Sequence, residues 1–177
     1  MNNKEIYREI EVQINQGRSK QEVFESFRKI VNHDDTLAKM VGSLPDKKLS
    51  IKYGKLNYIL FLILLFTALI KVLLAIPLVL SIAISAIPLL LVIPLLNLYF
   101  AVKVYKKRGY IYGCLGFIAI SGIFQAIGNI KSMNIMTIIN VLLMGIISAL
   151  SFYLGKKMFP NYNFFGPKKN ANGIYQL

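Results

Sequence analysis

The chain has 177 residues, of which 55% are hydrophobic and 16% are charged, and its mean hydropathy is +0.54. Soluble domains average about 45–50% apolar and about 25% charged residues, so this composition indicates a membrane protein without room for a large soluble enzyme domain. A net charge of +13 would favour nucleic acid binding in a soluble protein. Here the basic residues lie in short clusters beside apolar runs, as on the cytosolic side of membrane proteins, and we expect no nucleic acid partner.

The charges divide the chain into parts. All eight acidic residues lie at or before Asp46. The polar N-terminus lacks the pattern of a cleavable signal peptide, so we expect the first apolar segment to direct insertion. Residues 1–55 are then a cytosolic α-helical domain, residues 56–155 a four-helix transmembrane domain and residues 156–177 a cytosolic basic and aromatic tail. The predicted fold class is all-α, a polytopic membrane protein with four transmembrane helices preceded by a small cytosolic helical domain.

Two helices with clear boundaries are predicted near the N-terminus. The first covers about residues 4–16 and ends at Gly17, a residue suited to the left-handed position that follows a helix. Ser19 and Glu22 have the spacing of a capping box, in which each side chain satisfies a backbone N–H of the other residue. The second helix therefore begins just after Ser19.

A third short helix is predicted from Asp34 or Asp35 to the break at residues 42–45. Apolar residues recur at helical spacing in all three segments. They are the candidate core: Ile6, Ile10, Ile14, Val23, Phe24, Phe27, Ile30, Val31, Leu37, Met40 and Val41. So few core residues make a marginal domain, and we expect it to dock on the bundle, on a partner or on a second copy.

The apolar run at residues 56–102 contains one charge, Lys71. As a single helix it would be about 70 Å long, against a hydrocarbon core about 30 Å thick, so it must fold back. We expect the turn at residues 74–80, with Pro77 at the first position of the second helix. Pro88 and Pro94 lie inside that second helix and are candidate kinks, because each removes a backbone hydrogen bond. The four spans are predicted at residues 56–75, 77–102, 110–129 and 135–155.

Orientation follows from the basic residues at the ends of the spans. With the N-terminus inside, twelve basic residues lie at cytosolic edges, whereas the outer edges hold Lys71 and Lys131. Eight tyrosines fall on the same cytosolic side, so both termini are predicted to be cytosolic. Six basic residues beside the spans are candidate contacts for anionic cytosolic headgroups: Lys103, Lys106, Lys107, Arg108, Lys156 and Lys157.

The spans contain no acidic residue and no histidine. Proton-coupled carriers and membrane hydrolases use such buried groups, so we predict no enzymatic activity, no cofactor and no metal site. The one histidine, His33, precedes Asp34 and Asp35 and fits the end of one helix followed by an aspartate N-cap. Three adjacent residues cannot all face one metal ion on regular structure. The one cysteine, Cys114, lies in an apolar segment and excludes a disulfide within the chain.

Polar residues recur along one face of spans three and four and form a candidate polar seam: Ser121, Gln125, Asn129, Asn140, Ser148 and Ser151. Such residues let helices approach closely and hydrogen-bond across their interface. The alternative is a polar path for an ion or small solute, which with four spans would need several copies. Lys71 has two interpretations as well: its ammonium snorkels to the outer surface, or it contacts an anion or a lipid phosphate.

The leading functional hypothesis is a non-enzymatic membrane module, an accessory, regulatory or sensing subunit. Its residues 1–55 would mediate self-association into a homo-oligomer or bind a protein partner. One alternative is a small oligomeric transporter or channel, and another is an effector that permeabilises the membrane. The C-terminal tail is expected either to bind the anionic cytosolic leaflet or to be a flexible terminus.

Overall fold

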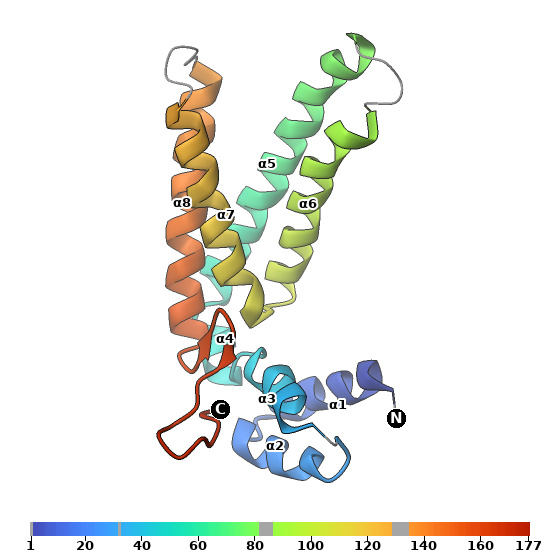
Figure 1. The fold of residues 1–177 in the computed structure, drawn as a ribbon, viewed down its shortest axis with the longest axis vertical. Coiled ribbons are helices and arrows are strands. Elements are labelled where there is room, and N and C mark those ends of the chain that lie inside the picture. The colour runs from blue at the N-terminus through green and yellow to red at the C-terminus, as the bar shows by residue number, and fades with distance from the viewer. Residues whose placement is uncertain (1, 32, 82–86, 129–134) are drawn as a thin grey trace.

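The computed structural model describes residues 2–31, 33–81, 87–128 and 135–177, and it describes their side chains except those of 74–81, 87–91 and 136. The described chain is mostly α-helical, as predicted, with two very short strands near the C-terminus. Figure 1 shows two long helical hairpins, α5 with α6 and α7 with α8, standing above a group of short N-terminal helices. The C-terminal segment lies beside these short helices.

The N-terminal unit consists of helices α1 (Asn3–Gln16), α2 (Lys20–Arg28) and α3 (Asp34–Gly42). The predicted caps of the first two helices are confirmed. Gly17 follows α1 with φ 101°, and Ser19 and Glu22 make both hydrogen bonds of the capping box before α2. These local signals suffice because a cap depends only on groups within four residues of each other.

The start of α3 corrects the reading of His33. The N-cap position is occupied by His33, which makes no side-chain cap hydrogen bond, and Asp34 and Asp35 lie in the first turn. Carboxylates in a first turn interact favourably with the positive end of the helix, so the two aspartates still suit this boundary.

The predicted core of the N-terminal unit is buried, with two exceptions. Met40 is partly buried against the core, and Ile30 is 52% exposed. The helix α2 ends at Arg28, so the helical periodicity that assigned Ile30 to the core does not extend to its position. The core also contains Leu44, which follows α3.

The first apolar segment folds back later than predicted. After the short helix α4 (Lys47–Lys52), helix α5 (Gly54–Ser81) continues through Pro77. The expected turn at residues 74–80 is therefore wrong. Proline is tolerated inside long apolar helices because neighbouring helices and local adjustments satisfy the carbonyl that it leaves free. The linking residues 82–86 lie outside the described part.

Helix α6 (Ile87–Tyr105) is described from Ile87, the first described residue after 82–86, whereas the second span is predicted from position 77. Pro88 is the second described residue of α6, and residues 82–86 before it lie outside the described part, so its role as a kink stays a prediction. Pro94 lies inside α6, as predicted. Helices α7 (Gly109–Gly128) and α8 (Ile135–Met158) agree with spans three and four, and α8 extends three residues further.

Within the described residues, three helical segments are long and apolar enough to cross a membrane: Gly54–Leu73, Gly109–Gly128 and Thr137–Met158. The segment Val92–Tyr105 of α6 is also apolar but shorter.

The two hairpins share their core at one end only. The cluster of buried residues that joins all four long helices runs from Leu60 and Leu64 on α5 to Leu154 and Met158 on α8. These positions lie in the half of the bundle next to the N-terminal unit, and Figure 1 shows the hairpins diverging towards their far ends. Each hairpin is thus packed along its own length, whereas the contact between hairpins is confined to the near half.

The C-terminal tail folds onto the protein. Strands β1 (Tyr162–Asn163) and β2 (Gly166–Pro167) pair antiparallel after α8. Further on, Tyr175 and Leu177 pack against the core of the N-terminal unit, and the rings of Tyr175 and Phe24 are 6.0 Å apart. The tail was expected either to bind the leaflet or to be flexible, whereas the structure shows a strap from α8 to α2 and α3.

Glycine 109 provides a test of this packing. A Cβ added at Gly109 would lie 2.8 Å from the ring of Phe159, which is only 2% exposed and cannot move aside. We expect Gly109→Ala to lower the free energy of unfolding by about 1–3 kcal/mol through overpacking. Gly145 is the matched control, because nothing lies within 4 Å of an added Cβ. Gly145→Ala should be neutral or stabilising by up to about 1 kcal/mol. Thermal unfolding in detergent compares the two variants, and equal midpoints would contradict the packing.

Candidate functional site

The loop between α6 and α7 joins the two hairpins and contacts the N-terminal unit. Arg108 in this loop donates from Nη2 to Glu11 Oε2 at 3.0 Å and from Nη1 to the hydroxyl of Tyr7. Its guanidinium lies over the ring of Tyr7, 4.4 Å from the centroid, and Tyr7 is hydrogen-bonded to Ser43 at 3.0 Å. One arginine therefore contacts α1 through both charge and an aromatic face.

Two further contacts attach the same loop. Lys107, which has φ 51°, donates from Nζ to Ser50 Oγ at 2.6 Å and to the Ser50 carbonyl at 3.3 Å. The backbone N–H of Gly109 donates to the carbonyl of Ser43 at 2.7 Å. The loop thus contacts α1, the end of α3 and α4. We call this set the loop clamp: Tyr7, Glu11, Ser43, Ser50, Lys107, Arg108 and Gly109.

The loop clamp is partly removed from water. The side chain of Arg108 is 14% exposed and that of Glu11 is 35% exposed. Burial raises the pKa of Tyr7, and its contacts with Ser43 and Arg108 lower it by less. Tyr7 therefore stays protonated at neutral pH and can keep its hydroxyl in the network. A partly buried, hydrogen-bonded ion pair of this kind is stronger than an exposed surface pair.

The tail attaches the second hairpin to the same unit. Tyr162 packs so closely on α3 that a Cβ added at Gly42 would be 3.0 Å from its ring, and burial raises the pKa of Tyr162 to about 12. Lys169 pairs with Asp35 at 3.3 Å, with both side chains at least half exposed. The N-terminal unit is therefore held by the loop between the hairpins and by the end of α8.

The six candidate headgroup contacts differ in their surroundings: some contact protein groups and others are exposed. Arg108 and Lys107 belong to the loop clamp and contact protein groups, and their contact with lipid headgroups stays a prediction. Charge asymmetry assigned them to the correct end of the bundle but could not distinguish lipid from protein partners. Lys103 lies over the rings of Tyr99 and Tyr110. The remaining three are exposed, and their contact with headgroups stays a prediction: Lys106, Lys156 and Lys157.

The residues of the candidate polar seam do not all lie in one place in the structure. Ser148 is buried and donates to the carbonyl of Gly116 across the α7–α8 interface at 3.3 Å. Ser151 is fully buried in the same interface, and its hydroxyl has no hydrogen-bond partner. These two fit the helix-packing interpretation.

The other seam residues lie elsewhere. Ser121 and Gln125 are exposed on the bundle surface. Asn129 lies outside the described residues. Asn140 lines a small pocket between the two hairpins. A single route lined by all of these residues is therefore not assembled within one described chain.

Two polar networks inside the bundle were not predicted. Asn57 on α5 donates to the carbonyl of Val104 at 2.9 Å and accepts from the hydroxyl of Tyr112 at 2.5 Å, so it joins both hairpins. Thr67 on α5 accepts from Asn97 on α6 at 3.4 Å. The available signal was the amide itself, because an Asn in an apolar span must find a partner across a helix interface.

No cluster of three or more metal-ligating side chains of the His, Cys, Asp and Glu types occurs among the residues that the structure describes. Comparison with protein-family models, with curated proteins and with solved structures finds no match to this chain.

The ion pair of the loop clamp can be measured directly. We expect Arg108→Gln to expose α1 to hydrogen exchange and proteolysis, because it removes a charge-assisted hydrogen bond and leaves Glu11 unpaired. In a double-mutant cycle with Glu11→Gln, the coupling should be about 1 kcal/mol, the range of partly exposed pairs. Lys106→Gln is the matched control, because Lys106 is exposed and belongs to the same loop. A coupling of zero would show that the pair does not hold the N-terminal unit.

Proposed function

We propose that this protein is a four-span, non-enzymatic membrane module with both termini in the cytosol. Its N-terminal unit would respond to the separation of the two hairpins. The fourth span in this proposal is α6. It lies alongside α5 for most of its length (Figure 1), and its 19 residues extend about 28 Å, close to the thickness of the hydrocarbon core. A membrane crossed by α5 would then be crossed by α6 as well.

The observation that carries this proposal is the loop clamp. The hairpins are joined to each other by the loop that contains Lys107 and Arg108, and that loop is bound to α1, α3 and α4. The tail binds the end of α8 to the same helices. A change in the angle between the hairpins would therefore act on the N-terminal unit through two attachments, which favours a regulatory or sensing role.

Charge placement also supports a non-enzymatic role. Every acidic residue lies at or before Asp46, and Glu11, Asp34 and Asp35 are engaged in ion pairs on the N-terminal unit. A protein partner or a second copy would bind the exposed side of that unit, where Val12 and Ile30 are 42% and 52% exposed.

Orientation is tested by cysteine accessibility in a Cys114→Ser background. Cysteines replacing Arg18 and Asn172 should be shielded from a membrane-impermeant maleimide in intact cells and should react after permeabilisation. A cysteine replacing Ile135, which is 75% exposed at the far end of α8, should react in intact cells. The reverse pattern would contradict the orientation, and opposite results at Arg18 and Asn172 would contradict the even number of spans.

Coupling between the hairpins and the N-terminal unit is tested by spin labels at the far ends. Labels on cysteines replacing Leu73 of α5 and Ile127 of α7, both exposed, report the hairpin separation in nanodiscs. We expect Arg108→Gln to broaden or shift the distance distribution, because the loop that joins the hairpins loses its attachment. Lys106→Gln should leave the distribution unchanged. An unchanged distribution in Arg108→Gln would contradict the coupling even if the four-span topology holds.

A further inference from the structure

A small pocket lies between the two hairpins, lined partly by residues of their shared core and partly by four polar side chains. Its polar lining consists of Thr67 and Lys71 from α5, Asn97 from α6 and Asn140 from α8. Apolar side chains, among them Phe100, complete the wall. These residues are far apart in the sequence, and the fold places them around one pocket.

The hydrogen bonds within the pocket leave donors available. Thr67 donates its hydroxyl to the carbonyl of Leu64 at 2.9 Å and accepts from Asn97 at 3.4 Å. The amide of Asn97 has a second N–H, and Asn140 contributes another amide group. The Lys71 ammonium can donate three hydrogen bonds. The pocket therefore offers several N–H donors around one positive charge.

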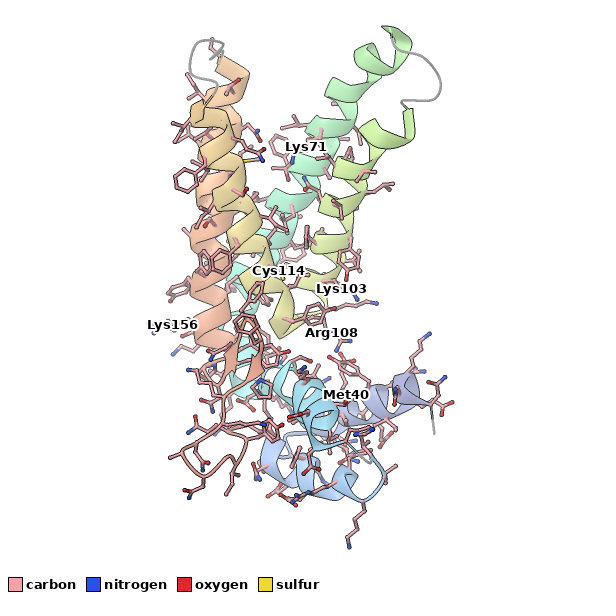
Figure 2. All side chains as sticks on the ribbon, in the orientation of Figure 1. Met40, Lys71, Lys103, Arg108, Cys114 and Lys156 are labelled. Carbon is pink, nitrogen blue, oxygen red and sulfur yellow. The ribbon has the colours of Figure 1, made fainter. Side chains whose placement is uncertain are left out.

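Lys71 has no carboxylate to pair with at this end of the bundle. The chain contains no Asp or Glu after Asp46, and the acidic residues lie on the N-terminal unit at the opposite end. Figure 2 shows Lys71 directed from α5 towards the space between the hairpins, and its side chain is half-buried. Simple snorkelling would direct the ammonium to the surrounding headgroups, without placing it on a pocket wall shared with two amides.

We propose that Lys71, Asn97 and Asn140 form a binding site for a phosphate-type oxyanion between the two hairpins. A charge inside an apolar bundle is costly unless it is paired, and an oxyanion would accept hydrogen bonds from the ammonium and from both amides. The pocket volume of about 50 Å³ holds a few water molecules or one small anionic group and excludes a bulky solute.

Two sources could supply this oxyanion. Lys71 follows Gly54, the start of α5, by 17 residues or about 25 Å of helix, which brings it near the far side of a core about 30 Å thick. A phospholipid of that leaflet could insert its phosphate there with its acyl chains between the diverging hairpins. A free phosphate ion could enter from the aqueous side. Both sources assume the membrane crossing proposed above.

The test measures binding of tail-labelled phosphatidylglycerol to the purified full chain in detergent. We expect Lys71→Gln to weaken binding about tenfold, the effect of losing one charge-assisted contact. Lys71→Arg should retain binding, and Asn140→Leu should reduce it several-fold. Lys29→Gln is the matched control, because Lys29 is an exposed lysine of the N-terminal unit and belongs neither to the pocket nor to the candidate headgroup contacts.

Competition identifies the source. If unlabelled phosphatidylglycerol displaces the probe and neither inorganic phosphate nor diacylglycerol does, the oxyanion is the phosphate of a phospholipid. If inorganic phosphate displaces it with the same dependence on Lys71, the site takes a free anion. Equal binding by wild type, Lys71→Gln and Asn140→Leu would overturn the site, and so would displacement by diacylglycerol, which has no phosphate, as effective as displacement by phosphatidylglycerol. Maleimide labelling at position 135 of the same variants separates a failed site from a failed membrane topology.

Discussion

The attachment of Arg108 to Tyr7 and Glu11 is the contact on which the arrangement of the protein depends. Three short helices bury too few side chains to be stable alone, so the N-terminal unit needs a support. The loop between the hairpins provides it, because the same residues that end α6 and begin α7 contact α1 and α3. The tail adds a second support from α8. The structure shows this unit docked on the bundle of its own chain, and its binding to a partner or a second copy stays a prediction.

The absence of acidic residues after Asp46 shapes the interior of the bundle. Without carboxylates, the long helices are joined by neutral groups: Asn57 with Tyr112, Thr67 with Asn97 and Ser148 with a carbonyl of α7. Neutral hydrogen bonds satisfy amides and hydroxyls at a smaller desolvation cost than buried ion pairs. They leave Lys71, among the described residues of this region, without a carboxylate of opposite charge.

Local features could be predicted from the sequence and distant ones could not. The caps at Gly17 and Ser19, the span composition and the core of the N-terminal unit depend on neighbours within a few residues. The turn after α5 was misplaced because an apolar run tolerates Pro77 within a helix, so composition alone does not locate its end. The loop clamp was missed because Arg108 and Glu11 are 97 positions apart. Periodicity identified polar faces on α7 and α8 but could not tell whether each face contacts protein or lipid. The residues of the candidate polar seam are therefore partly buried between helices and partly exposed.

The loop clamp and the pocket between the hairpins both depend on the angle between the two hairpins. The loop clamp lies where the hairpins are joined, and the pocket is lined by residues from both hairpins, so a change in the angle between them would change its shape. An oxyanion that binds one hairpin separation better than another must stabilise that separation by its difference in binding free energy. By linkage, anything that binds the N-terminal unit and favours the same separation must strengthen oxyanion binding by the same factor. The pocket and the N-terminal unit would then be coupled through the angle between the hairpins, which pivot about the loop between α6 and α7. This coupling would need no continuous chain of contacts along the bundle.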